Sequence, residues 1–422
     1  MTLVRPTYWD GMPFDFRAPP ERARVAPVKL RTQDLREVRG LRWSPPDGGR
    51  AGVLFMHPRV DFTRHYAIPR LVDAGFDVLA LNSRSPNDDT DTVHEELVLD
   101  VAAGVDALRA DHAKVALFGN SGGGSLMALH QREASRPPAE RLARYAWGAP
   151  TALPRVTLQP ADALVLVAAH RGEGHVLLRS IDPSVVDETD PVATDPALDM
   201  YAPENGFRPP PEEARYDAGF VRRYREAQRA RVARLDAWAL ARLAEANDAR
   251  RATKAPGFAS LSPLQRQTIE RARHTRHVKV VYRTMANLDY TDLSLDPSPR
   301  GYGSLLSERP DLMNRGLPGF ARTVTPRAWL STWSGLSSRA DLALTLPEID
   351  VPIFVAHAER DTEIFPRSDR AVIDAAIASE DRTTLVIEGA RHYFEPEPGA
   401  ERAPHVEALM DAIVPWLEAR VG

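Results

Sequence analysis

Lys114-Val-Ala-Leu-Phe-Gly-Asn-Ser-Gly-Gly-Gly-Ser125 is the stretch around which the chain is organised: an apolar run, a turn crowded with glycine, and the start of a helix-forming run. Its centre, Gly119-Asn-Ser-Gly-Gly123, fits the pattern Gly-x-Ser-x-Gly, in which a serine occupies a sharp turn between a strand and a helix. Small residues are needed two places before and after the serine, because strand and helix pass closely there. The pattern predicts that Ser121 is a nucleophile. The alternative is a glycine-rich loop that holds a phosphate or nothing.

Such a turn also places hydrogen-bond donors where they can stabilise a negative charge. The amide of Gly122 and the positive end of the following helix point at the oxygen that gains charge when the serine attacks. We therefore expect Gly122 to be one oxyanion donor and its neighbour Asn120 to be a substrate contact.

Apolar runs and amphipathic runs alternate on both sides of this stretch. A mostly parallel sheet with helices on both faces is the expected result, since strand-helix-strand alternation builds such sheets. Buried strands are predicted at residues 51–57, 76–81, 114–119, 162–169, 351–357 and 383–388, after two antiparallel edge strands near 28–31 and 37–43. Helices are predicted at 65–74, 94–110, 211–251, 262–286 and 404–419.

With these features the chain resembles the α/β-hydrolase family, over residues 48–170 and 345–420. The resemblance implies a catalytic triad in the order serine, acid, histidine. In the family a strand introduced by proline ends shortly before the acid, and Asp361 stands at that place; Glu359 and Glu363 are its rivals. His392 follows the last strand, where its imidazole can reach back to Ser121.

The loop after the strand at 51–57 begins His57-Pro58-Arg59-Val60. The resembling family places a His-Gly pair here and takes its second oxyanion donor from the amide of the next residue. Proline replaces that glycine, but it removes only its own N–H, so Arg59 keeps the donor position. Val60 is the alternative donor. His57 is expected to fix the loop by hydrogen bonds rather than to take part in the chemistry.

The alternation of strands and helices stops over residues 176–340, which are predicted to form a largely helical lid. This lid is inserted into a catalytic domain that consists of residues 26–175 and 341–422. Residues 1–25 are predicted to form an N-terminal arm. Between residues 215 and 283 there are 17 Lys and Arg against 6 Asp and Glu, a basic excess that is either a solvated helix face or an attraction for an anionic substrate. The lid tryptophans Trp329 and Trp333 are expected mainly in its core. Weaker substrate-contact candidates complete the site: His57, Val60, Asn120, His170 and Trp333.

Composition excludes several classes of function. The chain has 422 residues and no cysteine, so disulfides and cysteine chemistry are excluded. The net charge of −4 argues against nucleic-acid binding, and neither a signal peptide nor a membrane span is indicated, which favours a cytoplasmic protein. No metal or organic cofactor is required. The oligomeric state is left open, with a homodimer as one option.

The triad implies hydrolysis of a carboxylic ester or thioester of a small-molecule acyl substrate through an acyl-enzyme. Carbon–carbon bond hydrolysis and acyl transfer use the same machinery, and a binding protein that keeps the fold without the chemistry is the alternative outside enzymes.

Overall fold

The computed structural model describes residues 20–397 and 399–422. An eight-stranded sheet forms its centre, in the order β1-β2-β4-β3-β5-β6-β9-β10. Only β1 with β2 and β2 with β4 pair antiparallel, and all other neighbours in this sheet are parallel. The strands are β1 Arg24–Arg31, β2 Glu37–Ser44, β3 Gly52–Phe55, β4 Asp77–Leu81, β5 Val115–Asn120, β6 Ala163–Val167, β9 Ile353–Ala358 and β10 Arg382–Ile387.

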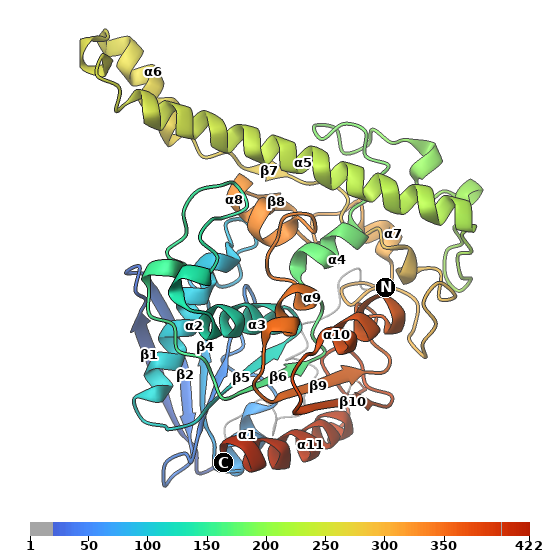
Figure 1. Ribbon diagram of the computed structural model, residues 1–422. Helices are drawn as coiled ribbons and strands as arrows, with labels where there is room; N and C mark the ends of the chain where they lie inside the picture. The colour runs from blue at the N-terminus through green and yellow to red at the C-terminus, as the bar shows by residue number, and fades with distance from the viewer. Residues whose placement is uncertain (1–19, 398) are drawn as a thin grey trace.

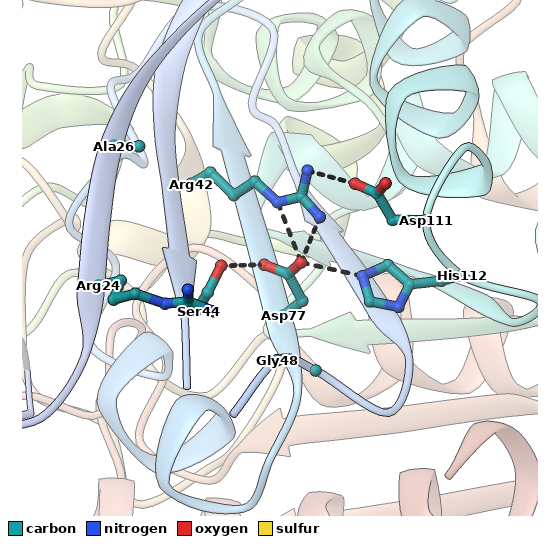
Figure 2. A pocket seen from close by; sticks show the side chains of 9 residues that line it. Arg24, Ala26, Arg42, Ser44, Gly48, Asp77, Asp111 and His112 are labelled. Carbon is teal, nitrogen blue, oxygen red and sulfur yellow. Dashed lines mark hydrogen bonds and ion pairs between the residues drawn. The ribbon is translucent and has the colours of Figure 1, made fainter. Parts of the chain in front are cut away.

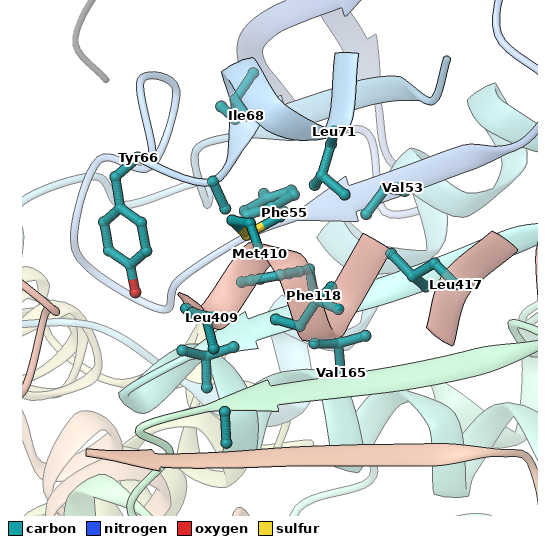
Figure 3. Close-up of a cluster of buried hydrophobic side chains, with 14 of the residues drawn as sticks. Val53, Phe55, Tyr66, Ile68, Leu71, Phe118, Val165, Leu409, Met410 and Leu417 are labelled. Carbon is teal, nitrogen blue, oxygen red and sulfur yellow. The ribbon is translucent and has the colours of Figure 1, made fainter. Parts of the chain in front are cut away.

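Helices cover both faces of this sheet (Figure 1). The cluster of buried side chains on one face joins the strands to α1 (Ile68–Asp73) and α11 (Pro404–Val421). Figure 3 shows this cluster, where Leu71 of α1 and Met410 of α11 meet Phe55 and Phe118, whose rings stack at 4.2 Å between centroids. The opposite face packs against α2 (His94–Arg109), α3 (Gly122–Ser135), α9 (Leu342–Thr345) and α10 (Ala371–Ala376).

The central strands are mostly apolar because both of their faces are covered; Asp77, Asn120 and His357 are the polar residues within them. Every residue of β3, β4, β5, β6 and β9 is buried, as expected for parallel strands between two helical layers. The edge strands β1 and β10 are instead exposed or partly buried at every position except Ile387, the last residue of β10, which is buried. The carboxyl ends of the parallel strands therefore form one rigid edge on which a site can be built.

A long insertion between β6 and β9 lies over that edge (Figure 1). It contains α4 (Glu173–Ser180), α5 (Ala218–Ala252), α6 (Pro263–His274), α7 (Pro310–Met313), α8 (Pro326–Ala328) and the short strands β7 (Lys279–Val280) and β8 (Thr323–Val324). Its core joins α4, α5 and the turn around Trp329 and Trp333, both fully buried. Beyond this core the C-terminal half of α5 and all of α6 project as a hairpin away from the sheet.

Several element boundaries differ from expectation. The long lid helix, expected from residue 211, begins at Ala218. The second lid helix, expected to reach residue 286, ends at His274; the chain then runs extended through β7, whose Val280 pairs with Thr323 of β8. The N-terminal arm was expected to reach residue 25, but Arg24 and Val25 already pair with β2 as part of β1. Most of the arm lies outside the described residues.

Among the described residues, no helix is long and apolar enough to cross a membrane. That part of the chain also contains no group of three or more His, Cys, Asp or Glu side chains arranged to hold a metal ion.

Candidate active site

Ser121 occupies the sharp turn between β5 and α3. Its backbone has φ 53° and ψ −126°, a conformation in which a residue with a side chain is strained. A Cβ on Gly119 would lie 2.6 Å from the Cα of Gly124, and one on Gly123 would lie 2.7 Å from the carbonyl oxygen of Met56. The spacing of the motif thus follows from backbone packing, since a side chain at either glycine would separate the helix from the strands.

Three residues from separate strand ends form a continuous chain of hydrogen bonds. His392 Nε2 lies 2.9 Å from Ser121 Oγ, and His392 Nδ1 lies 2.8 Å from Asp361 Oδ2. The two partners are 271 and 31 residues from His392 in sequence. This arrangement can transfer the serine proton to the imidazole while the carboxylate fixes the ring tautomer.

Asp361 is held in its ionised form. The backbone amides of Glu363 and Ile364 donate to its Oδ1 at 2.8 and 3.0 Å. Burial by itself raises the pKa of this carboxyl, but the nearby His392 and these hydrogen bonds outweigh burial and hold the pKa below its ordinary value. The side chain at position 361 is therefore suited to stabilise an imidazolium.

The two rival acids bind elsewhere. Glu359 accepts the amide N–H of Gly389 at 2.9 Å. The Glu363 carboxyl lies 2.8 and 2.9 Å from the hydroxyl of Tyr290 in the insertion. Of these three acids, the structure brings Asp361 to His392.

Tyr393 is a site residue that the sequence reasoning missed. Its phenol hydrogen-bonds with the side chain of Ser121, and its backbone amide donates to Glu395 Oε2 at 3.0 Å. Burial raises the pKa of the phenol, so it remains a donor at neutral pH. Its position directly after His392 was the available signal.

The loop after β3 differs from the expected oxyanion arrangement. The amides of Arg59 and Val60 both donate to His57 Nδ1, at 3.1 and 3.0 Å. Neither N–H is therefore open to an oxyanion in this conformation, and the expectation that Arg59 donates there must be corrected. The imidazole of His57 fixes the loop, as expected.

Polar side chains converge over Gly122 instead. A Cβ at this position would lie 2.4 Å from Glu173 Oε1, 2.9 Å from His57 Nε2 and 3.2 Å from His170 Nε2. Glu173 stands at the start of α4, just beyond the end of β6, and the sequence analysis did not identify it as a site residue. Glycine is required at 122 because these side chains occupy the space that a side chain would fill.

Glu173 forms the centre of a buried ion network. The Nε of Arg59 lies 3.2 Å from Glu173 Oε1, and its Nη1 lies 3.2 Å from Asp89 Oδ1. Burial opposes ionisation of Glu173, but Arg59 and the surrounding histidines lower its pKa to about 2. The guanidinium also lies over the ring of Trp333, 5.2 Å from its centroid. Trp333 thus packs against the arginine, and its Nε1 donates to the carbonyl of Asp89 at 3.1 Å.

Two other substrate-contact candidates have different surroundings. Asn120 is fully buried: its Oδ1 lies 2.9 Å from His65 Nε2 and 3.2 Å from the Tyr66 hydroxyl, and its Nδ2 donates to the Val167 carbonyl at 2.7 Å. It supports the strand rather than facing a substrate, so that expectation is corrected. His170 is buried with Nε2 3.9 Å from Glu173 Oε2, and its Nδ1 has no partner among the described residues.

A separate hollow of about 470 Å³ lies near the amino end of β4 (Figure 2). Asp77 at its centre accepts from Arg42 Nε at 3.0 Å and from Ser44 Oγ at 2.8 Å, and it lies 2.9 Å from His112 Nε2. Although serine, histidine and aspartate meet here, the serine hydroxyl donates to the carboxylate and not to the imidazole. These groups satisfy one another and provide no activated nucleophile.

Several arginines of the basic segment are internal to the insertion. Arg231 binds Glu188 at 2.8 Å and Arg283 binds Asp182 at 3.0 Å, and both guanidinium groups are buried. The exposed basic residues near α6 lie on the projecting hairpin. Attraction of an anionic substrate by this segment stays a hypothesis.

No family model matches the chain, and no curated protein matches it in sequence. Solved structures do match it along nearly its full length. The DcsB complex with its substrate analogue is 13% identical, with a TM-score of 0.50 over 94% of this chain and 100% of that chain. A hypothetical protein from Pseudomonas aeruginosa is 14% identical (TM-score 0.49, 100% and 99% covered), and the alpha/beta hydrolase GrgF from Penicillium sp. sh18 is 13% identical (TM-score 0.48, 94% and 99% covered). At such identities the likeness concerns the fold alone.

Proposed function

We propose that this chain, which has the α/β-hydrolase fold, is a serine hydrolase that cleaves a carboxylic ester or thioester of a small-molecule acyl substrate. The observation that carries the proposal is the hydrogen-bonded chain from Asp361 through His392 to Ser121, with distances of 2.8 and 2.9 Å. The strained turn supports it, because such strain is typical of functional residues.

In the proposed reaction Ser121 Oγ forms a bond to the acyl carbon while His392 Nε2 takes the hydroxyl proton. The carbonyl π electrons move to the oxygen, which gains a negative charge near the amide of Gly122. When the tetrahedral species collapses, the bond to the leaving group breaks and His392 returns the proton to it. Water, deprotonated by the same imidazole, then attacks the acyl-enzyme; the bond from the acyl carbon to Ser121 Oγ breaks, His392 returns the proton to Oγ, and the acid is released.

Acyl transfer is the second candidate, favoured by the burial of the nucleophile. Ser121 is only 6% exposed beneath the insertion. A site that excludes water favours a bound alcohol, thiol or amine over water as the acceptor. Adding such acceptors to an ester assay and measuring the transfer product would separate the two reactions.

The decisive experiment is intact-mass spectrometry after incubation with a fluorophosphonate, on the parent and on Ser121→Ala. A panel of p-nitrophenyl acyl esters of increasing chain length accompanies it. One adduct that disappears in the variant together with ester turnover is the expected result. Labelling without turnover would direct the search to thioesters, carbon–carbon cleavage or transfer. A folded parent that takes no label would contradict the proposal and favour a binding protein.

A further inference from the structure

We propose that the imidazole of His57 supplies the second oxyanion donor through its Nε2–H, in place of a backbone amide of the loop after β3. This inference rests on the serine hydrolase function proposed above. In this proposal His57 stabilises the oxyanion and also anchors the loop after β3.

The hydrogen bonds of the loop fix the tautomer of His57. The amides of Arg59 and Val60 both donate to Nδ1, at 3.1 and 3.0 Å. A nitrogen that accepts two N–H groups carries no proton, so the single proton of the neutral ring is on Nε2. The same two bonds that remove the backbone donors therefore create a side-chain donor.

The position of that donor suits an oxyanion. His57 Nε2 lies 2.9 Å from the place where a Cβ of Gly122 would be, beside the residue whose amide is the other donor. None of the described residues accepts a hydrogen bond from Nε2. The ring packs against Phe62, 5.0 Å away between centroids. A preorganised donor of this kind requires little reorganisation during the reaction.

The imidazole also stays neutral. Burial lowers the pKa of His57 far below its ordinary value, and this outweighs the opposing effect of Glu173. The charged or titratable groups around it are Glu173, Arg59, His170 and His94. Since Glu173 is paired with Arg59, its carboxylate is balanced by a guanidinium. His57 therefore donates a hydrogen bond without transferring a proton, and His392 remains the base.

Two substitutions separate the donor from the anchor. His57→Asn keeps an acceptor near the position of Nδ1 but has no group at Nε2. His57→Gln places an amide N–H near Nε2 but has no acceptor at Nδ1. We measure kcat and KM on the best p-nitrophenyl ester, the rate of fluorophosphonate labelling, and thermal unfolding of each variant.

We expect His57→Asn to lose about 10²- to 10³-fold in kcat, the usual effect of removing one oxyanion donor, with KM changed less than about threefold. His57→Gln should keep kcat within about tenfold of the parent. Affinity for a boronic acid, which forms a charged tetrahedral adduct with the serine, should fall in His57→Asn by a factor similar to that of kcat.

Retention of kcat by His57→Asn, or a 10²-fold loss in a folded His57→Gln, would overturn the proposal and leave His57 as an anchor only. If His57→Asn does not fold, the kcat of His57→Gln decides alone: a loss of about 10²-fold in this folded variant overturns the proposal. A parent that neither takes the phosphonate nor turns over esters would instead contradict the proposed function. The two failures are therefore distinguishable.

Discussion

The hydroxyl of Tyr290 lies 2.8 and 2.9 Å from the two carboxyl oxygens of Glu363, and so connects the insertion to the loop that carries Asp361. Glu363 is buried near Asp361, Asp369 and Glu173. Burial and these like charges raise its pKa to about 8, although the bond to Tyr290 favours the ionised form. Through Tyr290 the insertion therefore contacts a carboxyl group that is neutral over much of the physiological pH range.

The first prediction is a pH dependence of stability. The folded pKa of Glu363 is raised from 4.5 to about 8, so the folded state binds this proton more tightly than the unfolded state does. The contribution of protonated Glu363 to the free energy of unfolding is complete below about pH 4.5 and is lost as the pH rises to about 8. The loss is on the order of a few kcal/mol. Urea unfolding at pH 5.5 and 8.5 measures the loss. Glu363→Gln should flatten this part of the profile, and an unchanged slope in that variant would contradict the assignment.

The second prediction concerns the triad acid. Asp361→Asn should lower kcat about 10⁴-fold with the protein still folded, because an amide no longer selects the reactive tautomer of His392. Glu359→Gln is the matched control in the same loop, since Glu359 bonds to the Gly389 amide and not to the imidazole. Ester turnover is the measurement. If the Asn variant kept a tenth of the parent rate, the role given to Asp361 would be wrong.

The third prediction tests the crowding over Gly122. In Gly122→Ala the new methyl group would lie 2.4 Å from Glu173 Oε1 and 2.9 Å from His57 Nε2. We expect a loss of about 1–3 kcal/mol in the free energy of unfolding and a fall in kcat of more than about tenfold. Gly257→Ala is the control, because nothing lies within 4 Å of its Cβ position. Equal stability of the two variants would show that the polar side chains move aside at no cost.

The fourth prediction concerns the buried ion pair. Glu173→Gln leaves the Arg59 guanidinium with Asp89 as its remaining ion-pair partner and should lower the free energy of unfolding by about 3 kcal/mol. Asp248→Asn breaks an exposed pair with Arg251 on α5 and should change stability by less than about 0.5 kcal/mol. Urea unfolding at pH 7 compares the two. A Gln variant as stable as the parent would mean that the network contributes no net stability.

Much of the fold and part of the site follow from local pattern. Continuous apolar runs predicted the buried strands, because strands covered on both faces need no polar side. Gly119 and Gly123 predicted the turn, because backbone atoms leave no room there. Asp361 and His392 could be selected by their places after strands, since parallel strands present their carboxyl ends at one edge.

Other features were not accessible from local pattern. Asn120 looked like a substrate contact beside the nucleophile, yet β5 directs it to His65 and Val167 in the core. The extent of the second lid helix was overestimated, because tertiary pairing of β7 with β8 competes with helical propensity after His274. Glu173 belongs to the site only because β6 ends beside β5.

The sequence by itself determined the order of the strands and helices and the residue types capable of nucleophilic chemistry, because hydrophobic period and turn geometry are local properties. The tertiary structure decided which polar groups meet: His392 with Ser121, Arg59 with Glu173, and the amides of Arg59 and Val60 with His57. These pairings depend on where separate strand ends converge and on which hydrogen bonds are satisfied after burial. The sequence shows neither the convergence of the strand ends nor these hydrogen bonds, because the residues that meet lie far apart along the chain.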